Sequence, residues 1–181
     1  MKDFHDLIVQ RRSIRRYTDS PLSPDQVTLI LQAGLLAPTS KSSRAWHFIA
    51  VEEKDMLERL AGCKSAGAAS LPGCSLAIVV AVDSTVSEAW IEDAAVAATL
   101  MQLQAEDLGL GSCWVQVRGR FTADGTPAEE VVQESLLMPE NITPVCIITI
   151  GNKNEERKPQ NIEKLKWENV HIGKWSNDNT L

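Results

Sequence analysis

The chain has 181 residues, of which 44% are hydrophobic and 23% are charged, and its formal net charge is -6. This size and balance predict a single globular domain, residues 1–181, with a core of its own. The acidic balance argues against a nucleic-acid surface, and no apolar run approaches the roughly 18 residues that a membrane span needs. Because the N-terminus also lacks a secretory signal pattern, we expect a cytoplasmic protein without nucleic-acid or membrane partners.

The first two predicted helices flank an unusual basic stretch. Residues 3–10 carry Phe4, Leu7 and Ile8 at helical spacing, which predicts a short amphipathic helix. The second helix is predicted to begin at Ser23, because Ser23 and Gln26 form a capping-box pattern with a proline between them. It is expected to end near Pro38, which cannot continue the hydrogen-bond ladder.

The stretch between these helices reads Gln10-Arg11-Arg12-Ser13-Ile14-Arg15-Arg16-Tyr17 and concentrates four arginines in an acidic protein. Guanidinium groups match the oxygens of phosphate, and the Ser13 hydroxyl can bind the same anion. A solvated helix end is the alternative, because cations are common where a helix terminates. Composition alone leaves both interpretations open.

A hydroxyl-rich loop, residues 38–44, precedes a predicted strand at residues 46–51. Such a loop can carry a ligand or can be plain solvent-exposed chain. His47 alternates with apolar neighbours along the strand and is predicted to be packed, because no metal-ligating partner lies nearby in the sequence.

The middle of the chain predicts a short helix at residues 54–61, a mobile Gly/Ala/Ser-rich passage at 62–73 and a buried strand at 76–82. A long alanine-rich helix at residues 87–108 follows, and its small side chains suit close packing. Gly109 is predicted to end this helix.

The last third predicts a strand at residues 112–117, a helix opened by Thr126 and Pro127, and a strand at 145–150. The polar tail after residue 151 contains Trp167 and Trp175, so we expect it to pack on something, such as another subunit. The four cysteines form no CxxC pair and are predicted to be buried thiols rather than metal ligands or disulfides. The pattern as a whole predicts one α+β domain.

No motif of a serine hydrolase, zinc protease, P-loop NTPase or Rossmann dinucleotide site is present. What remains is a basic cluster, a hydroxyl-rich loop and a strand exit, which together would suit an anionic cofactor that supplies the chemistry itself.

These three pieces, in this order, resemble the FMN-dependent nitroreductase family. Residues 11–15 resemble its R-x-S-x-(R/K) motif, residues 37–48 its P-S-S-x-N-x-Q-P-W-x-F segment, and residues 109–114 its G-L-G-(S/T)-C-W motif. The resemblance implies an α+β fold with a mostly antiparallel sheet of about four to five strands flanked by helices. It also implies an intertwined homodimer in which the C-terminal extension, residues 152–181, packs on the partner subunit.

The family's roles, carried onto matching positions, imply an FMN site at the dimer interface. The resemblance implies that Arg11, Arg12 and Ser13 bind the phosphate, and that Arg15 reaches the N1 and C2-carbonyl edge of the flavin. Residues of the strand exit would lie beside the ring, with an amide of Gln116 or Val117 toward N5. The full implied set is Arg11, Arg12, Ser13, Arg15, Pro38, Thr39, Ser40, Ser42, Trp114, Val115, Gln116, Val117 and Lys158.

The implied activity is an oxidoreductase that passes a hydride from NAD(P)H through flavin N5 to a nitroaromatic or quinone, with no catalytic side chain and no metal. The loop departs from the family pattern, because Ser42, Arg44 and Ala45 stand where the family has Asn, Gln and Pro. A flavin-binding or flavin-storage protein with little turnover is therefore an alternative. A third possibility is a protein without flavin whose basic cluster binds an acidic partner.

Overall fold

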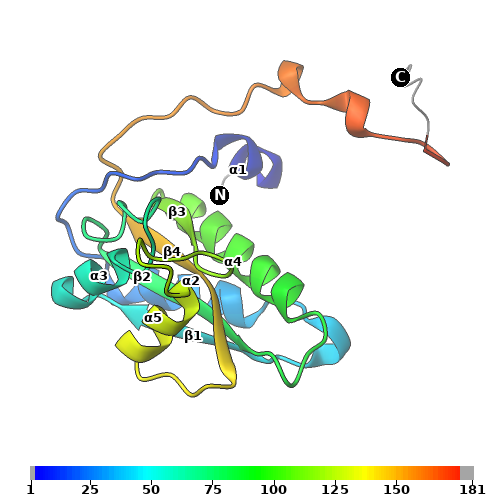
Figure 1. The fold of residues 1–181 in the computed structure, drawn as a ribbon. Coiled ribbons are helices and arrows are strands. Elements are labelled where there is room, and N and C mark those ends of the chain that lie inside the picture. Colours follow the sequence, from blue (N-terminus) through cyan, green and yellow to red (C-terminus); the bar gives the residue numbers. More distant parts are fainter. Residues whose placement is uncertain (1–2, 176–181) are drawn as a thin grey trace.

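A four-stranded antiparallel sheet, with strand order β1-β2-β4-β3, forms the centre of the fold (Figure 1). The structure is a computed structural model and describes residues 3–175. Its strands are β1 (Trp46–Val51), β2 (Leu76–Asp83), β3 (Gly111–Gln116) and β4 (Ile142–Gly151). The α-helices of the described chain are α1 (Phe4–Gln10), α2 (Pro24–Leu35), α3 (Lys54–Ala61), α4 (Trp90–Asp107) and α5 (Ala128–Ser135). The α+β prediction is confirmed, with four strands.

The two central strands are buried on both faces, which explains their uninterrupted apolar sequences. Ile78 and Val80 of β2 pack in the core layer that contains α2 and α4. Their neighbours Ala77 and Val79 face the opposite layer, which contains α3 and α5. Because side chains alternate across a strand, one apolar run can supply both layers.

The helix boundaries follow the predicted chemistry in two places. Ser23 and Gln26 form the expected reciprocal capping box at the start of α2. At the end of α4, Gly109 has a φ of +78°. The Gly109 amide donates to Glu106 O at 3.0 Å and the Leu110 amide to Ala105 O at 2.9 Å, the pair of bonds that closes a Schellman motif. This turn reverses the chain from α4 directly into β3.

Three predictions in the body of the domain are wrong. Helix α4 begins at Trp90 rather than at residue 87, because the Ser87 hydroxyl bonds to Asp93 instead of capping the helix. Helix α5 has no side-chain cap. Strand β1 lies at the edge of the sheet, and His47 on it is exposed.

Part of the passage at residues 62–73, whose composition predicted mobility, packs into the core. Ala68, Ser70 and Leu71 are buried, and two of them belong to the core layer with α3 and α5. All four cysteines are buried and free, as predicted.

The chain after β4 leaves the body of the domain (Figure 1). From Pro159 to Val170 every residue is exposed, and the side chains of Trp167 and Trp175 are 57% and 77% accessible. The last six residues of the predicted extension lie outside the described residues. Within residues 3–175, no helix is both long and apolar enough to cross a membrane.

Candidate functional site

The basic segment, residues 11–16, leaves α1 in an extended conformation and lies beside the start of β3. Ser13 and Ser112 form a parallel bridge, and the Ile14 amide donates to Ser112 O at 2.9 Å. Ile14 is buried, whereas Arg15 and Arg16 are exposed. The buried isoleucine therefore fixes the segment on the sheet while its basic side chains remain accessible.

Tyr17 anchors the end of the basic segment from inside the core. Its hydroxyl is 2.6 Å from Ile14 O and 2.8 Å from Thr149 Oγ1, and Thr149 in turn bonds to Ser70. Burial raises the pKa of Tyr17 far above its usual value, so the phenol stays protonated and can donate.

Two glycines allow the basic segment to approach the sheet. A Cβ at Gly111 would lie 2.7 Å from Ile14 Cγ2, and one at Gly151 would lie 2.9 Å from Tyr17 Cδ1. Since contacts this short do not occur, any other residue would displace the basic segment. The requirement for glycine at these two strand ends is therefore steric.

The start of the tail runs antiparallel to the basic segment and holds it from the other side. The Asn154 amide donates to Arg16 O at 3.0 Å, and the Arg15 amide donates to Glu155 Oε1 at 2.6 Å. The Arg15 amide, and to a smaller extent Arg157, lower the pKa of Glu155. The two chain segments are therefore joined by both a backbone bond and a bond to the Glu155 carboxylate.

A cavity of about 630 Å³ lies between these two segments, lined by Gln10, Arg12, Ile14 and residues 153–157. The Arg12 guanidinium donates to the backbone carbonyl of Lys158. Lys158 thus meets the basic segment through its main chain, whereas Lys153 and Arg157 are the tail cations that line the cavity, paired with Glu106 and Glu155 respectively.

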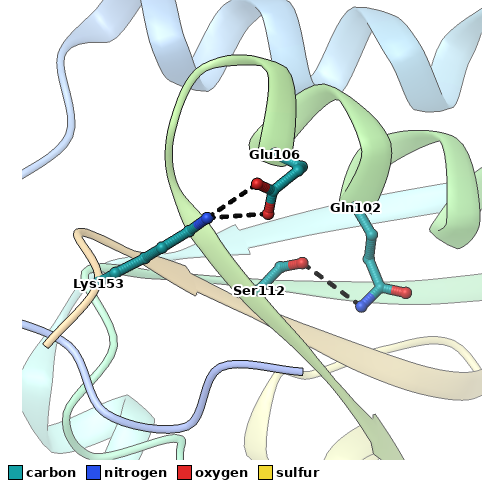
Figure 2. A network of polar contacts seen from close by, with 4 residues as sticks. All are labelled: Gln102, Glu106, Ser112 and Lys153. Atoms are coloured by element: carbon teal, nitrogen blue, oxygen red, sulfur yellow. Dashed lines mark hydrogen bonds and ion pairs between the residues drawn. The ribbon is translucent and has the colours of Figure 1, made fainter. Parts of the chain in front are cut away.

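Behind the basic segment, the end of α4 is joined to β3 and to the tail by buried polar groups (Figure 2). Lys153 Nζ lies 2.9 Å from both carboxylate oxygens of the buried Glu106. Gln102 donates to Ser112 Oγ at 3.4 Å. Because Glu106 is buried and Lys153 is partly exposed, replacing Lys153 would leave the buried carboxylate without its counter-charge.

Three cations surround Cys113 on β3. Burial raises the pKa of this thiol, and the positive charges of Arg15, Lys64 and Arg11 oppose that rise. Lys64 also donates from Nζ to Gln116 O at 2.8 Å. Within residues 3–175, none of the three cations forms an ion pair.

Lys64 was not among the predicted site residues. It lies in the passage at residues 62–73, whose composition suggested mobility rather than a site. A lone lysine in such a stretch gives no motif, and only the packing of this passage brings it beside β3.

The open edge of β3 presents particular backbone groups. The Val117 amide donates to Val145 O at 3.2 Å, so it faces β4. Ser112 O and Gln116 O accept bonds from Ile14 and Lys64 on the other side. Since amide groups alternate between the two edges of a strand, the amides of Trp114 and Gln116 point to the open edge.

Burial also alternates among the side chains at the end of β3. Val115 and Val117 are buried in the core, whereas Trp114 and Gln116 are only partly buried. Gln116 Oε1 accepts from the Trp114 indole at 2.9 Å, and Gln116 Nε2 donates to Arg118 O at 2.8 Å. Gln116 therefore braces the exit of β3.

The hydroxyl-rich loop, residues 38–44, is held by one buried carboxylate at the start of α4. Asp93 accepts from the Ser40 amide at 2.8 Å, from Ser87 Oγ at 2.9 Å and from Ser43 Oγ at 3.4 Å. No sequence motif pointed to Asp93, because its partners lie on two other segments.

The same loop has strained backbone geometry. Lys41, Ser42 and Arg44 have positive φ values of 51°, 54° and 48°. Such conformations are uncommon for residues with a Cβ and tend to cluster at functional sites. The Thr39 hydroxyl accepts from the Arg44 amide at 3.0 Å and helps to close the loop.

The structure does not bring the two predicted groups together within one chain. The loop lies at the start of α4, whereas the basic segment passes the other end of that helix (Figure 1). Among the described residues, no hydrogen bond or ion pair connects them. The described chain also contains no cluster of His, Cys, Asp or Glu that could hold a metal ion.

Comparison with known proteins identifies relatives along nearly the whole chain. A family model described as "Nitroreductase family" matches residues 8–84 and 83–152. A protein of Archaeoglobus fulgidus with the provisional name NADH dehydrogenase/NAD(P)H nitroreductase is 32% identical over 183 residues, which cover 92% of this chain and 100% of the relative.

Solved structures agree. An FMN-dependent nitroreductase from Clostridium difficile R20291 superposes with a TM-score of 0.91 at 42% identity, covering 93% of this chain and 98% of its own. A Parabacteroides distasonis structure, provisionally named NADH dehydrogenase/NAD(P)H nitroreductase, has a TM-score of 0.87 at 30% identity and covers 97% and 100% of the two chains. The resemblance seen in the ordered motifs is confirmed: this protein belongs to the nitroreductase family.

Proposed function

We propose that this protein is an FMN-dependent oxidoreductase that passes a hydride from NAD(P)H to a nitroaromatic or quinone acceptor. The observation that carries the proposal is the group of three cations, Arg11, Arg15 and Lys64, beside the open edge of β3. Cations left without carboxylate partners in an acidic protein are suited to an anionic ligand.

The residues present fit FMN. Arg11 and the Ser13 hydroxyl, which has no hydrogen-bond partner within residues 3–175, are suited to the phosphate. Arg15 and Lys64 would stabilise negative charge at the pyrimidine edge, and the Gln116 amide is the donor that the open edge offers to N5. Bound FMN would supply a two-electron acceptor and donor at that atom.

The overall reaction balances without a protein acid or base as reactant. NAD(P)H loses a hydride and one proton comes from solvent, so that a quinone becomes a hydroquinone or a nitro group becomes a nitroso group and water. The protein's part is to hold, orient and charge-stabilise the reactants, and we assign no catalytic side chain.

We further propose that the site is completed by a second copy of the chain. The loop with Pro38, Thr39, Ser40 and Ser42 lies at the other end of α4, so it would reach the cofactor from the partner subunit. The exposed tail with Trp167 and Trp175 would pack on that subunit. Arg157 lines the cavity beside Arg12, but its guanidinium is paired with Glu155 at 2.8 Å, so it would contribute to the site as part of that ion pair.

Flavin content tests the proposal directly. The purified protein should be yellow, or should bind added FMN stoichiometrically, and a colourless protein that takes up no FMN would overturn it. Under anaerobic conditions, NADH or NADPH should bleach the bound flavin quickly. Stable FMN that neither nicotinamide reduces would favour a flavin-storage protein instead.

A further inference from the structure

A rigid turn follows β3 and carries two more arginines, Arg118 and Arg120. The Arg120 amide donates to Val117 O at 3.0 Å, and Gly119 between the arginines has a φ of +68°. The Gly119 amide donates to Glu129 Oε1 at 2.7 Å, which ties the turn to α5. The positions of both arginines are therefore set by the backbone.

The same turn is joined to the passage that contains Lys64. The Ser65 amide donates to Phe121 O at 3.0 Å. Arg120 lies close enough to Lys64 for its charge to add to the effect of burial in lowering the pKa of Lys64. We call Lys64, Arg118, Arg120 and Phe121 the exit rim, because they surround the end of β3.

Phe121 gives the exit rim an aromatic surface. Its side chain is 54% exposed, although large apolar side chains are usually buried. The Arg118 guanidinium carbon lies 5.3 Å from the centre of the Trp90 ring. Cations and aromatic rings thus lie together around the end of β3.

The positive charge of the exit rim is not neutralised within the described chain. The ion pairs found among residues 3–175 involve other cations. Glu129 accepts from the Gly119 backbone, and Asp124 accepts from the hydroxyls of Thr122 and Thr126. Both carboxylates keep their negative charge, but among residues 3–175 neither forms an ion pair with a cation of the exit rim.

We propose that the exit rim binds the anionic group of the electron acceptor, so that the preferred acceptors are nitroaromatics or quinones that carry a carboxylate or sulfonate. This inference rests on the proposed function. The phosphate and pyrimidine edge of FMN are already matched by Arg11, Ser13 and Arg15, whereas the exit rim adds two arginines on the turn that follows Gln116. A guanidinium pairs well with a carboxylate, and the exposed ring suits the acceptor's aromatic plane.

The kinetic test compares 4-nitrobenzoate with its neutral methyl ester. The parent protein should favour the anion in kcat/KM, and the variant Arg118→Gln/Arg120→Gln should reduce the ratio of anion to ester about tenfold, which is the effect of roughly 1.4 kcal/mol. Arg59→Gln, an exposed arginine on α3, is the matched control and should keep the parent ratio. An equal ratio in parent and double variant would overturn the inference.

A binding measurement provides a second readout that needs no turnover. Calorimetric titration of the FMN-loaded, oxidised protein with benzoate and with benzamide should show tighter binding of the anion, reduced by added salt and by the double variant. If flavin content or reduction by nicotinamide fails, the proposed function has failed. If both succeed and benzoate binds no better than benzamide, only this inference has failed.

The nicotinamide is the competing source of an anion, because NADPH carries a 2′-phosphate. The rate of flavin reduction by NADPH relative to NADH should be the same in the parent and in Arg118→Gln/Arg120→Gln. A variant that loses NADPH preference while keeping the parent's ratio of anion to ester would assign the exit rim to the nucleotide and overturn the proposal.

Discussion

The basic segment and the hydroxyl-rich loop were both predicted to contact one cofactor, but the protein holds them in different ways. Residues 11–16 are fixed by backbone bonds to Ser112 and the tail and by the buried Tyr17. Residues 38–44 are held mainly by the buried carboxylate of Asp93, with an exposed ion pair between Lys41 and Glu88, and three of them have a left-handed backbone. Residues 11–16 are therefore bonded directly to the edge of the sheet, whereas residues 38–44 are bonded to the start of α4.

We therefore expect the two regions to act differently: residues 11–16 provide most of the affinity for the cofactor, and residues 38–44 complete its site. The basic segment carries the charge that would bind an anion, and its support comes from many bonds of its own chain. The loop is proposed to contribute hydroxyl and backbone groups, and the buried Asp93 is the main side chain that holds it. Removing charge from residues 11–16 should therefore abolish FMN binding. Loosening residues 38–44 should weaken FMN binding while the protein stays folded.

The largest effect is expected when the charge of the basic segment is removed. Arg11→Ala/Arg15→Ala should weaken FMN binding at least a hundredfold, because hydrogen bonds to charged groups contribute about 1.5–3 kcal/mol each. Fluorescence titration with FMN measures this loss. Arg16→Ala, an exposed neighbour, is the control and should retain FMN. A double variant with full flavin content would instead favour the basic cluster as a surface for an acidic partner.

The next effect is expected at the anchor of the loop. Asp93→Ala should lower the free energy of unfolding by about 1–3 kcal/mol, because the Ser40 amide and two serine hydroxyls lose their acceptor. FMN affinity should fall about tenfold if the loop contacts the cofactor.

The controls for this anchor are on the same helix and at the same position. Glu92→Ala removes an exposed carboxylate next to Asp93 and should change neither quantity. Asp93→Asn keeps one acceptor oxygen and should lie between the parent and Asp93→Ala. Normal FMN affinity in a folded Asp93→Ala protein would show that the loop does not contribute to the site.

A change at Tyr17 should act on stability more than on binding. Tyr17→Phe removes the hydroxyl bonded to Ile14 O and Thr149 and should cost about 1–2 kcal/mol in unfolding free energy. Because the tail and Ser112 still hold the basic segment, FMN affinity should fall only a few-fold. Chemical denaturation and FMN titration on the same samples compare the two. A larger loss of affinity than of stability would mean that Tyr17 alone positions the arginines.

The sequence predicted the parts of the fold that depend on local chemistry. The capping box at Ser23, the glycine end of α4 and the apolar run of β2 each follow from a few neighbouring residues, and all three are observed. The family could also be predicted, because its three motifs occur in order.

Features that depend on distant contacts could not be predicted. Asp93 belongs to no local sequence motif, because its partners are distant in the sequence: one loop precedes β1 and the other follows β2. Lys64 lies in a passage whose small residues resemble a flexible linker. The passage is nevertheless packed, because its residues Ala68 and Leu71 are buried in the core. The open-edge position of the Gln116 amide depends on the pairing of β3 with β4, which the sequence does not state.

The smallest predicted effect is a dependence on pH that comes from Lys64. Burial is the main cause that lowers the pKa of Lys64. Cys63 opposes this shift, the charge of Arg120 adds to it, and Cys113 opposes it to a smaller extent. The ammonium charge is lost as pH rises through this lowered pKa, which lies below that of an exposed lysine. FMN affinity should therefore fall a few-fold in the alkaline range, and Lys64→Arg should retain it to higher pH, because arginine stays protonated. If the parent and Lys64→Arg have the same pH profile, the Lys64 charge does not act on the cofactor, and the binding charge belongs to the basic segment alone.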